Sequence, residues 1–327
     1  MTGSDGLLGS NIVRCLLDYG YNVRAFSQQG KSTPTLDDLP IERAYGDVLD
    51  SGSLERAAEG VSTIIHAAAN TSVWPSRSRI VREVNLKGTQ NAIQAAVRAQ
   101  VDRFVYIGTA NSFSPGTKEA PGDETTPFIC GKYQLDYIDS KYEAQQEVLR
   151  AVESLNLPAL TINPTFMIGP FDSTPSSGMM LIKLGQGKIP GYTTGGKCWT
   201  HARDVAVAVV NSLTKGRLGE SYIAGNENLD YGEFFQLAAK TIGVKPPRLK
   251  MAAPLVKASG AFGSLTAALI GRPPLLSYAM ARIGCDGHYY DSSKAHKQLE
   301  MPATPLDQAV RESYDWLVAH GYVRGGR

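Results

Sequence analysis

Two residues that can move a proton together, Tyr137 and Lys141, stand four positions apart in the sequence. The segment 137–150 has the pattern of a helix, so this spacing places both side chains on one face, one turn apart. A phenol titrates near ~10, and a neighbouring ammonium favours the phenolate. The pair therefore has the chemistry to give or take a proton. Tyr-x-x-x-Lys is also common on exposed amphipathic helices, so the neighbouring segments must decide between the two interpretations.

A glycine-rich loop opens the chain, ahead of an apolar helical pattern at residues 11–19. Such a loop lets backbone N–H groups approach a pyrophosphate at a helix N-terminus, where the helix dipole favours negative charge. A strand pattern follows at residues 21–26, which is the context that a dinucleotide-binding loop requires. We therefore predict a dinucleotide site that includes Gly3, Gly6, Leu7, Leu8 and Gly9.

The strand that should precede this loop is missing. A doubly wound sheet needs its first strand ahead of Thr2, in the middle of the sheet, and only Met1 stands there. We expect that the true start lies upstream or that the chain has been shortened. If the chain is complete, its sheet lacks a central strand and the loop is poorly anchored.

Strand and helix patterns alternate through the first half of the chain. Strands are predicted at 42–45, 61–69 and 103–107, and helices at 54–59 and 81–99. This alternation indicates an α/β fold, a doubly wound parallel sheet with helices on both faces. Ligands bind beyond the carboxyl ends of such strands, where Thr109 stands.

Several residues at these strand ends are expected to contact a dinucleotide. Asp47 and the Val48 backbone can hold the adenine amino edge, while the small residues Ala67 and Ala68 let a cofactor pass closely. His66, just before them, is interpreted as a core residue. No carboxylate lies between Asp18 and Asp37, where an acidic residue usually holds the ribose of NAD. Ser27 and Lys31 can receive a phosphate there, so we predict NADP(H) in preference to NAD(H).

Composition narrows the class of protein. The chain has 327 residues, of which 43% are hydrophobic and 20% are charged, and its formal net charge is +2. That charge is too small to argue for nucleic acid or an anionic membrane. The four cysteines lie far apart and the five histidines lack metal-ligand spacing, so we predict neither a disulfide framework nor a metal site. The most apolar stretch, 252–271, is interpreted as a packed or pocket-lining helix rather than a membrane span, and the predicted compartment is the cytoplasm.

The order of these motifs resembles that of the extended short-chain dehydrogenase/reductases, the NAD-dependent epimerase/dehydratase family, over essentially the whole chain. Within the family, the sequence looks closest to the dihydroflavonol-4-reductase-like branch. The motifs that carry the resemblance are Thr2-Gly3-x-x-Gly6-x-x-Gly9, Gly46-Asp47, His66-Ala-Ala-Ala69, Asn85-x-x-Gly88-Thr89, Thr109, Tyr137-x-x-x-Lys141, Asn163-Pro-Thr, Gly169-Pro170-Phe-Asp172, Trp199-Thr-His-Ala-Arg-Asp204 and Asp291-Ser-Ser-Lys294.

The resemblance implies catalytic roles for Thr109, Tyr137 and Lys141. Tyr137 would protonate a carbonyl oxygen as hydride arrives, or act as the base in the reverse direction. Lys141 would lower the tyrosine pKa and bind the nicotinamide ribose. Thr109 stands where the family usually has Ser, and its hydroxyl can still polarise the substrate oxygen. Pro164 and Thr165 would border the nicotinamide carboxamide, and Asn85 would serve either in packing or in a proton relay.

The resemblance also implies a Rossmann domain with a smaller C-terminal α/β substrate domain. We predict the dinucleotide-binding domain at 1–170 plus about 198–225, and the substrate-binding domain at 171–197 and 226–327. Aromatic and methionine side chains between residues 171 and 235 suit an apolar pocket, although at least half of them are expected to be core residues, and basic residues leave a nucleotide-linked substrate open. The candidate pocket residues are Phe171, Met179, Met180, Tyr192, Trp199, Tyr231, Phe234 and Phe235.

The predicted function is an NAD(P)H-dependent oxidoreductase that interconverts a carbonyl and an alcohol on a small, largely apolar or aromatic substrate. An NAD-dependent nucleotide-sugar epimerase is the alternative, and a non-enzymatic NAD(P)-sensing scaffold is the third choice. Thr109-Ala110-Asn111 replaces the Thr-Asp-Glu of sugar-nucleotide dehydratases, which disfavours that reaction. The expected partner is a small-molecule substrate, without nucleic acid or membrane. The family often pairs through helices like 81–99 and 137–150, which suggests a homodimer.

Overall fold

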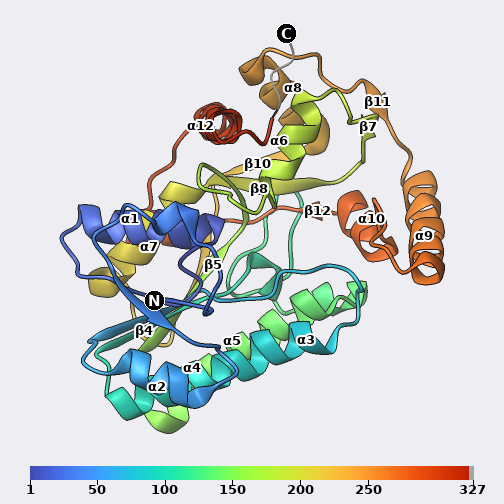
Figure 1. Cartoon of the computed structure of the whole chain (residues 1–327). Helices are drawn as coiled ribbons and strands as arrows, with labels where there is room; N and C mark the ends of the chain where they lie inside the picture. Colours follow the sequence, from blue (N-terminus) through green and yellow to red (C-terminus); the bar gives the residue numbers. More distant parts are fainter. Residues whose placement is uncertain (324–327) are drawn as a thin grey trace.

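A parallel sheet forms the centre of the molecule, for which the computed structural model describes residues 1–323 (Figure 1). Its strands pair in the order β2-β1 and β3-β4-β5-β9, and all of these pairs are parallel. The strands are β1 (Arg24–Ser27), β2 (Glu42–Tyr45), β3 (Thr63–His66), β4 (Arg103–Ile107), β5 (Ala159–Pro164) and β9 (Ser221–Ala224). The prediction of a doubly wound α/β fold is confirmed.

The start of the chain joins the two halves of this sheet. Thr2 makes parallel bridges to Phe26 of β1 and to His66 of β3. Its N–H donates to the Ile65 carbonyl (3.0 Å), and the Phe26 N–H donates to the Met1 carbonyl (2.8 Å). Met1 and Thr2 therefore lie in the middle of the sheet, directly before the glycine-rich loop.

Helices cover both faces of the sheet (Figure 1). One apolar cluster joins α1 (Leu7–Asp18) and α7 (Ala202–Lys215) to the strands, with α11 (Ser293–Gln298) at its edge. The other joins α2 (Ser51–Ala58), α4 (Gly88–Ala99) and α5 (Asp136–Leu155) to the opposite face. Because β4 and β5 are buried on both faces, their sequences are nearly continuous apolar runs.

The long helix predicted at 81–99 is divided in three. It begins as α3 (Arg79–Arg82), widens into a π-helical turn, η2 (Glu83–Lys87), and continues as α4. The wide turn carries Asn85, whose side chain accepts a hydrogen bond from the Asn70 N–H (2.7 Å) and donates to the Asn70 carbonyl (3.1 Å). Wide turns of this kind often occur at functional sites.

A second sheet lies above the carboxyl edge of the first. Its strand β8 (Gly196–His201) pairs with β6 (Phe166–Ile168), β10 (Glu227–Asp230) and β12 (Gly287–His288). The flanking helices are α6 (Gly178–Gly185), α8 (Tyr231–Ile242) and α12 (Leu306–Ala319). Between β8 and β10 the chain returns through α7 to β9 of the first sheet.

The aromatic side chains proposed for a pocket largely form the core of this second sheet. Trp199 is fully buried and stacks on Phe234 with ring centroids 3.6 Å apart, and Phe235 is buried beside them. Of the two interpretations, pocket or core, these three side chains therefore follow the core interpretation. They are buried because β8 is covered by α8, and large rings fill that interface.

The most peripheral elements are α9 (Ala253–Ile270) and α10 (Tyr278–Cys285), which stand together at the edge of the molecule (Figure 1). A short sheet of β7 (Gly191–Tyr192) and β11 (Leu249–Lys250) precedes them. The helix expected at 252–271 packs on one face only, because just Val256, Gly260 and Ala267 of α9 are buried. Among the described residues, α9 is the one helix long and apolar enough to cross a membrane.

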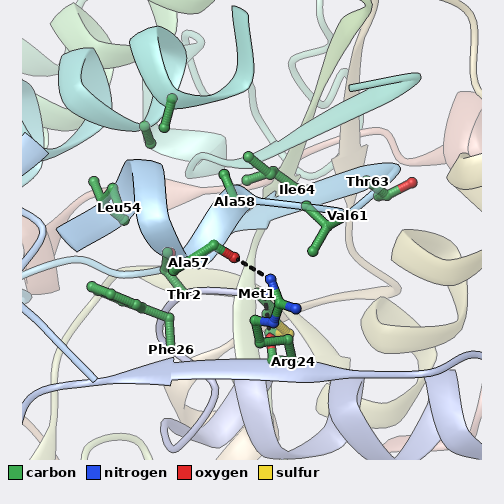
Figure 2. Close-up of a pocket in the computed structure, with 12 residues that line it drawn as sticks. Met1, Thr2, Arg24, Phe26, Leu54, Ala57, Ala58, Val61, Thr63 and Ile64 are labelled. Carbon is green, nitrogen blue, oxygen red and sulfur yellow. Dashed lines mark hydrogen bonds between the residues drawn. The ribbon is translucent and has the colours of Figure 1, made fainter. Parts of the chain in front are cut away.

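A groove between β1, β3 and α2 lies near the amino ends of these strands, and Figure 2 shows its lining. Arg24 reaches across it to donate to the Ala57 carbonyl (3.0 Å). The Met1 ammonium donates to the Arg24 carbonyl (2.7 Å), and burial lowers its pKa to about 5. This groove is at the opposite edge of the sheet from the glycine-rich loop, so it is separate from the candidate active site.

Candidate active site

Helix α5 carries both Tyr137 and Lys141, and acidic side chains in its first turn hold it in place. Asp136 accepts hydrogen bonds from the Ser78 N–H (2.6 Å) and from Arg77 (2.8 Å). Arg77 also donates to Asp139 (2.8 Å). Because these residues flank Tyr137, their bonds to the segment before α3 set the position of its ring.

The Tyr137 phenol lies beside Thr109, so the structure brings together two of the three predicted catalytic residues. Thr109 follows β4 and caps the short helix η3 (Ala110–Ser112). Burial raises the pKa of Tyr137, and the hydrogen bond from Thr109 opposes that rise. A phenol in this state is protonated at neutral pH and ready to donate.

Lys141 lies beneath Tyr137 with a side chain that is only 3% exposed. Its ammonium donates to the Ile107 carbonyl (2.6 Å) and sits 4.2 Å from the centroid of the Tyr106 ring. Burial lowers the pKa of Lys141 to about 7. The expectation that Lys141 lowers the tyrosine pKa is not met here, because burial of the phenol dominates.

Asn85 connects the end of β3 to the catalytic helix. Besides its two bonds to Asn70, its amide donates to the Ser140 hydroxyl (3.0 Å). The Ser140 hydroxyl in turn donates to the Tyr137 carbonyl (3.3 Å). Asn85 is 1% exposed, so the contacts support a positioning role for it.

A buried amide pair beneath Thr109 was not foreseen from the sequence. Asn163 of β5 donates to the Thr109 carbonyl (3.1 Å) and to Gln145 (2.5 Å), and it accepts from Thr161 (2.8 Å). The signal for Gln145 was available, since it follows Tyr137 and Lys141 at the same four-residue spacing on one helix face. The pair joins β5 and α5 directly under the site.

The glycine-rich loop has the geometry that a pyrophosphate needs. Gly3 has φ +65°, and a Cβ there would meet the Ala68 nitrogen at 2.5 Å, so the loop lies directly against Ala67 and Ala68. Gly6 precedes α1, whose N-terminus has no side-chain cap, and a Cβ on Gly6 would meet only the Gly3 carbonyl at 3.7 Å. The first N–H groups of α1, from Leu7 and Leu8 onward, therefore face open space that fits a phosphate group.

The residues predicted to select the cofactor make contacts that the sequence did not indicate. Lys31 forms an ion pair with Asp5 of the glycine-rich loop (2.8 Å). Gln28 donates to Asp47 (3.3 Å), and Ser27 is buried at the end of β1. Lys31, the side chain expected to bind a phosphate, therefore already has an acidic partner in the glycine-rich loop.

The remaining predicted cofactor residues lie at strand ends. Val48 is buried, and its carbonyl accepts from Asn91 (2.9 Å). Pro164 ends β5, and the Thr165 hydroxyl donates to the Ala224 carbonyl of β9 (3.3 Å). Pro164 and Thr165 therefore stand at the carboxyl edge of the sheet, as Thr109 does.

A second polar cluster links the C-terminal part of the chain to the site, and sequence reasoning missed it. Tyr133 donates to Asp286 (2.6 Å) and contacts His288 (3.1 Å), which contacts Asn111 (3.0 Å), two residues after Thr109. Burial lowers the pKa of His288, and nearby Lys197 adds to the effect. His288 was passed over because its spacing suits no metal, and no group of metal-ligating side chains occurs within residues 1–323.

His66 is a core residue, and it makes a prediction about acid stability. Its ring contacts the hydroxyls of Thr2 (2.9 Å) and Thr89 (3.2 Å), and burial first, then Lys141, lowers its pKa from 6.5 to about 3. Between these values the unfolded chain binds one more proton than the folded one, so the free energy of unfolding should fall by up to ~1.4 kcal/mol per pH unit as pH falls. When the free energy of unfolding is measured in urea between these pH values, it should fall less steeply with falling pH in His66→Gln than in the wild type. Parallel curves for wild type and His66→Gln would contradict this, and the exposed His320→Gln is the control.

Comparisons with known proteins bear on the family and the fold of the chain. Residues 1–225 match the model of a family described as the NAD dependent epimerase/dehydratase family. A Synechocystis protein provisionally named dihydroflavonol 4-reductase is 29% identical, over 99% of this chain and 95% of its own. Sterol demethylase protein B of Methylococcus capsulatus is 30% identical, over 99% of both chains. The crystal structure of gox2253 has a TM-score of 0.87 at 30% identity and covers 99% of this chain and 98% of its own.

Proposed function

Because the chain belongs to the NAD dependent epimerase/dehydratase family, the extended short-chain dehydrogenase/reductases, we propose that it is an oxidoreductase that interconverts a carbonyl and an alcohol. The observation that carries the proposal is the Thr109, Tyr137 and Lys141 arrangement at the carboxyl edge of the sheet, beyond the uncapped N-terminus of α1. A nicotinamide cofactor, when bound, supplies or accepts the hydride.

The chain's own residues manage the proton. Tyr137 donates its phenolic proton to the carbonyl oxygen of the substrate, or accepts one from the alcohol in reverse. Thr109 polarises the same oxygen, and its hydroxyl, which lies beside the phenol, can stabilise the phenolate. The buried Asn163 and Gln145 keep the Thr109 backbone in place, and Lys141 provides the cation nearest the end of β4.

Apolar side chains beside Tyr137 support an apolar or aromatic substrate. Tyr137 packs against a buried cluster that includes Leu135 and Ile283, and Phe128 and Met280 pack against the same cluster. A charged sugar nucleotide would have to be desolvated against this surface, whereas a hydrophobic ketone or aldehyde would gain by burying it.

Turnover of a carbonyl panel tests the function. Purified protein should oxidise NADPH or NADH with hydrophobic ketones or aldehydes, and mass spectrometry of denatured protein should find little or exchangeable nucleotide. Stoichiometric NAD, together with sugar-nucleotide conversion that consumes no cofactor, would instead establish the epimerase. Nucleotide binding without any turnover would leave the sensing scaffold.

Cofactor choice depends on the Lys31 and Asp5 pair. NADP(H) is preferred in this proposal because Lys31 and Ser27 stand at the end of β1. Lys31→Ala should lower kcat/KM for NADPH by about tenfold and leave NADH nearly unchanged, the scale expected for one phosphate contact. Asp5→Asn should instead raise kcat/KM for NADPH, because the substitution releases Lys31 from its ion pair. Equal changes for both cofactors, measured by initial rates, would reject the assignment.

Three further features belong to the same proposal. The dinucleotide-binding domain is 1–170 plus about 198–225, and 171–197 with 226–327 binds the substrate. Two copies pair through α4 and α5, which light scattering of the purified protein tests directly. The protein works in the cytoplasm, which fractionation of the native cells tests.

A further inference from the structure

Helix α9 exposes an apolar stripe to solvent. Leu255, Phe262, Leu265 and Leu269 are all more than 60% exposed, and their spacing of seven, three and four residues places them on one face. Ile270 and Leu275 extend the surface, with Leu275 97% exposed. Isolated exposed leucines are ordinary, but a continuous apolar stripe of this kind marks a site that binds another protein or a membrane.

The opposite face of α9 packs on α10. Gly260 approaches Ala281 and the Ser277 carbonyl so closely that a Cβ would meet the Ala281 methyl at 2.5 Å. The exposed stripe is therefore the outward face of a packed helix pair. The chain enters α9 from β11 and leaves it through α10, and both of these contact the rest of the fold. Crossing a bilayer would place these two elements on opposite sides, so α9 can lie in a membrane interface but cannot span it.

The sequence segment that contains α9 carries charge of one sign only. From residue 234 to residue 285 the sequence contains no Asp or Glu. The same segment contains Lys240, Lys245, Arg248, Lys250, Lys257, Arg272 and Arg282. None of the seven forms an ion pair with the described residues of the chain. Because the whole chain has a net charge of only +2, the positive charge is concentrated here.

We propose that α9 docks the protein on an anionic lipid bilayer, with the helix in the plane of the interface and the Leu255, Phe262, Leu265 and Leu269 stripe in the acyl boundary. The exposed cations Lys250 and Arg272 bracket the helix and lie where lipid phosphates would be. Apolar burial combined with attraction to anionic lipid is what holds interfacial helices on membranes.

A second copy of this chain is the other apolar partner to consider, and the charges disfavour it. A two-fold interface brings the same surface of both copies together. The exposed cations at the ends of α9, Lys250 and Arg272, would then face those of the other copy, with no carboxylate in residues 234–285 to pair with them. An anionic bilayer has the complementary charge, which reverses the expectation from net charge that the protein has no membrane partner.

Docking at α9 places the bilayer beside the candidate active site. Met280 and Ile283 of α10 belong to the apolar cluster that includes Tyr137. A carbonyl compound dissolved in the bilayer would therefore meet the protein on the side of its Tyr137 cluster. This consequence for substrate access rests on the proposed function, whereas the docking itself does not.

Vesicle co-sedimentation of the full-length protein tests the docking. Wild type should sediment with vesicles of phosphatidylcholine and phosphatidylglycerol, more weakly with phosphatidylcholine alone, and less as salt rises. Phe262→Glu with Leu265→Glu should weaken binding by about tenfold or more, and so should Lys250→Glu with Arg272→Glu. The control is Leu218→Glu, which changes an exposed leucine of the β9 loop (51% exposed) and should bind as wild type does.

Three results would overturn the proposal. The first is wild-type protein that stays in the supernatant with every vesicle composition. The second is double variants that bind vesicles as well as the wild type does. The third is a dimer or larger assembly, seen by light scattering, that dissociates in the double variant Phe262→Glu with Leu265→Glu, because a second copy would then cover the stripe. Equal thermal melting curves establish that the variants are folded, which their exposed positions lead us to expect.

Discussion

Tyr137→Phe should abolish carbonyl reduction while cofactor binding survives. The substitution removes one hydroxyl from a partly buried ring and leaves the ring's packing against the cluster of Leu135, Ile138 and Ile283 unchanged. Loss of a positioned acid costs about 10²–10⁴-fold in rate, so kcat should fall by that amount. Steady-state rates and nicotinamide binding by fluorescence titration, measured on the same preparation, separate the two effects.

The control for this variant is Tyr19→Phe, a tyrosine that is 54% exposed at the end of α1. It should retain wild-type rates. Turnover in Tyr137→Phe within threefold of wild type would refute the assignment of Tyr137 as the acid. Loss of nicotinamide binding together with turnover would assign the phenol to cofactor binding and not to proton transfer.

Gly6→Ala and Gly9→Ala should separate cofactor binding from folding. A Cβ on Gly6 meets only the Gly3 carbonyl at 3.7 Å, so Gly6→Ala should leave Tm nearly unchanged. It would, however, occupy the space before α1 that a pyrophosphate requires, so the Kd for the nicotinamide dinucleotide should rise by at least about tenfold. Thermal melting and isothermal titration measure the two quantities.

Gly9→Ala should damage both properties. Its Cβ would overlap the Gly3 carbonyl oxygen and lie 2.9 Å from the Ser4 carbonyl carbon, so the loop or α1 must move. Overpacking of this kind typically costs about 1–3 kcal/mol of stability. Unchanged cofactor affinity in Gly6→Ala, with Gly9→Ala weakened, would place the dinucleotide away from this helix N-terminus.

Local sequence patterns predicted the main sheet because each of its elements is specified by nearby residues. Glu42–Tyr45 and Arg103–Ile107 are strands with the predicted bounds. Each is followed by a glycine, Gly46 or Gly108, which is a turn signal. Helix α5 also begins within one residue of the prediction. The spacing of Tyr137 and Lys141 follows directly from that helix, so their common face required no tertiary information.

The contacts that the sequence left open are those between distant segments. The Lys31 and Asp5 pair joins residues on two different loops. Tyr133, His288 and Asn111 come from three elements that are far apart in the sequence. Trp199 and Phe234 looked equally suited to a pocket or a core, because an aromatic residue's sequence context does not show which helix will cover it. Helix α9 differs from the prediction for another reason, since its apolar composition predicts burial on all sides, whereas the structure covers only the face that packs on α10.

The passage of the chain through the second sheet before β9 sets an order for folding during synthesis. The β5 edge of the main sheet pairs with β9 in register from Thr161 with Ser221 to Pro164 with Ala224. A ribosome must therefore deliver β6, α6, β8 and α7 before that edge acquires its partner. Until then β5 presents unpaired N–H and C=O groups, which makes it the strand through which a nascent chain can pair with a neighbouring polypeptide.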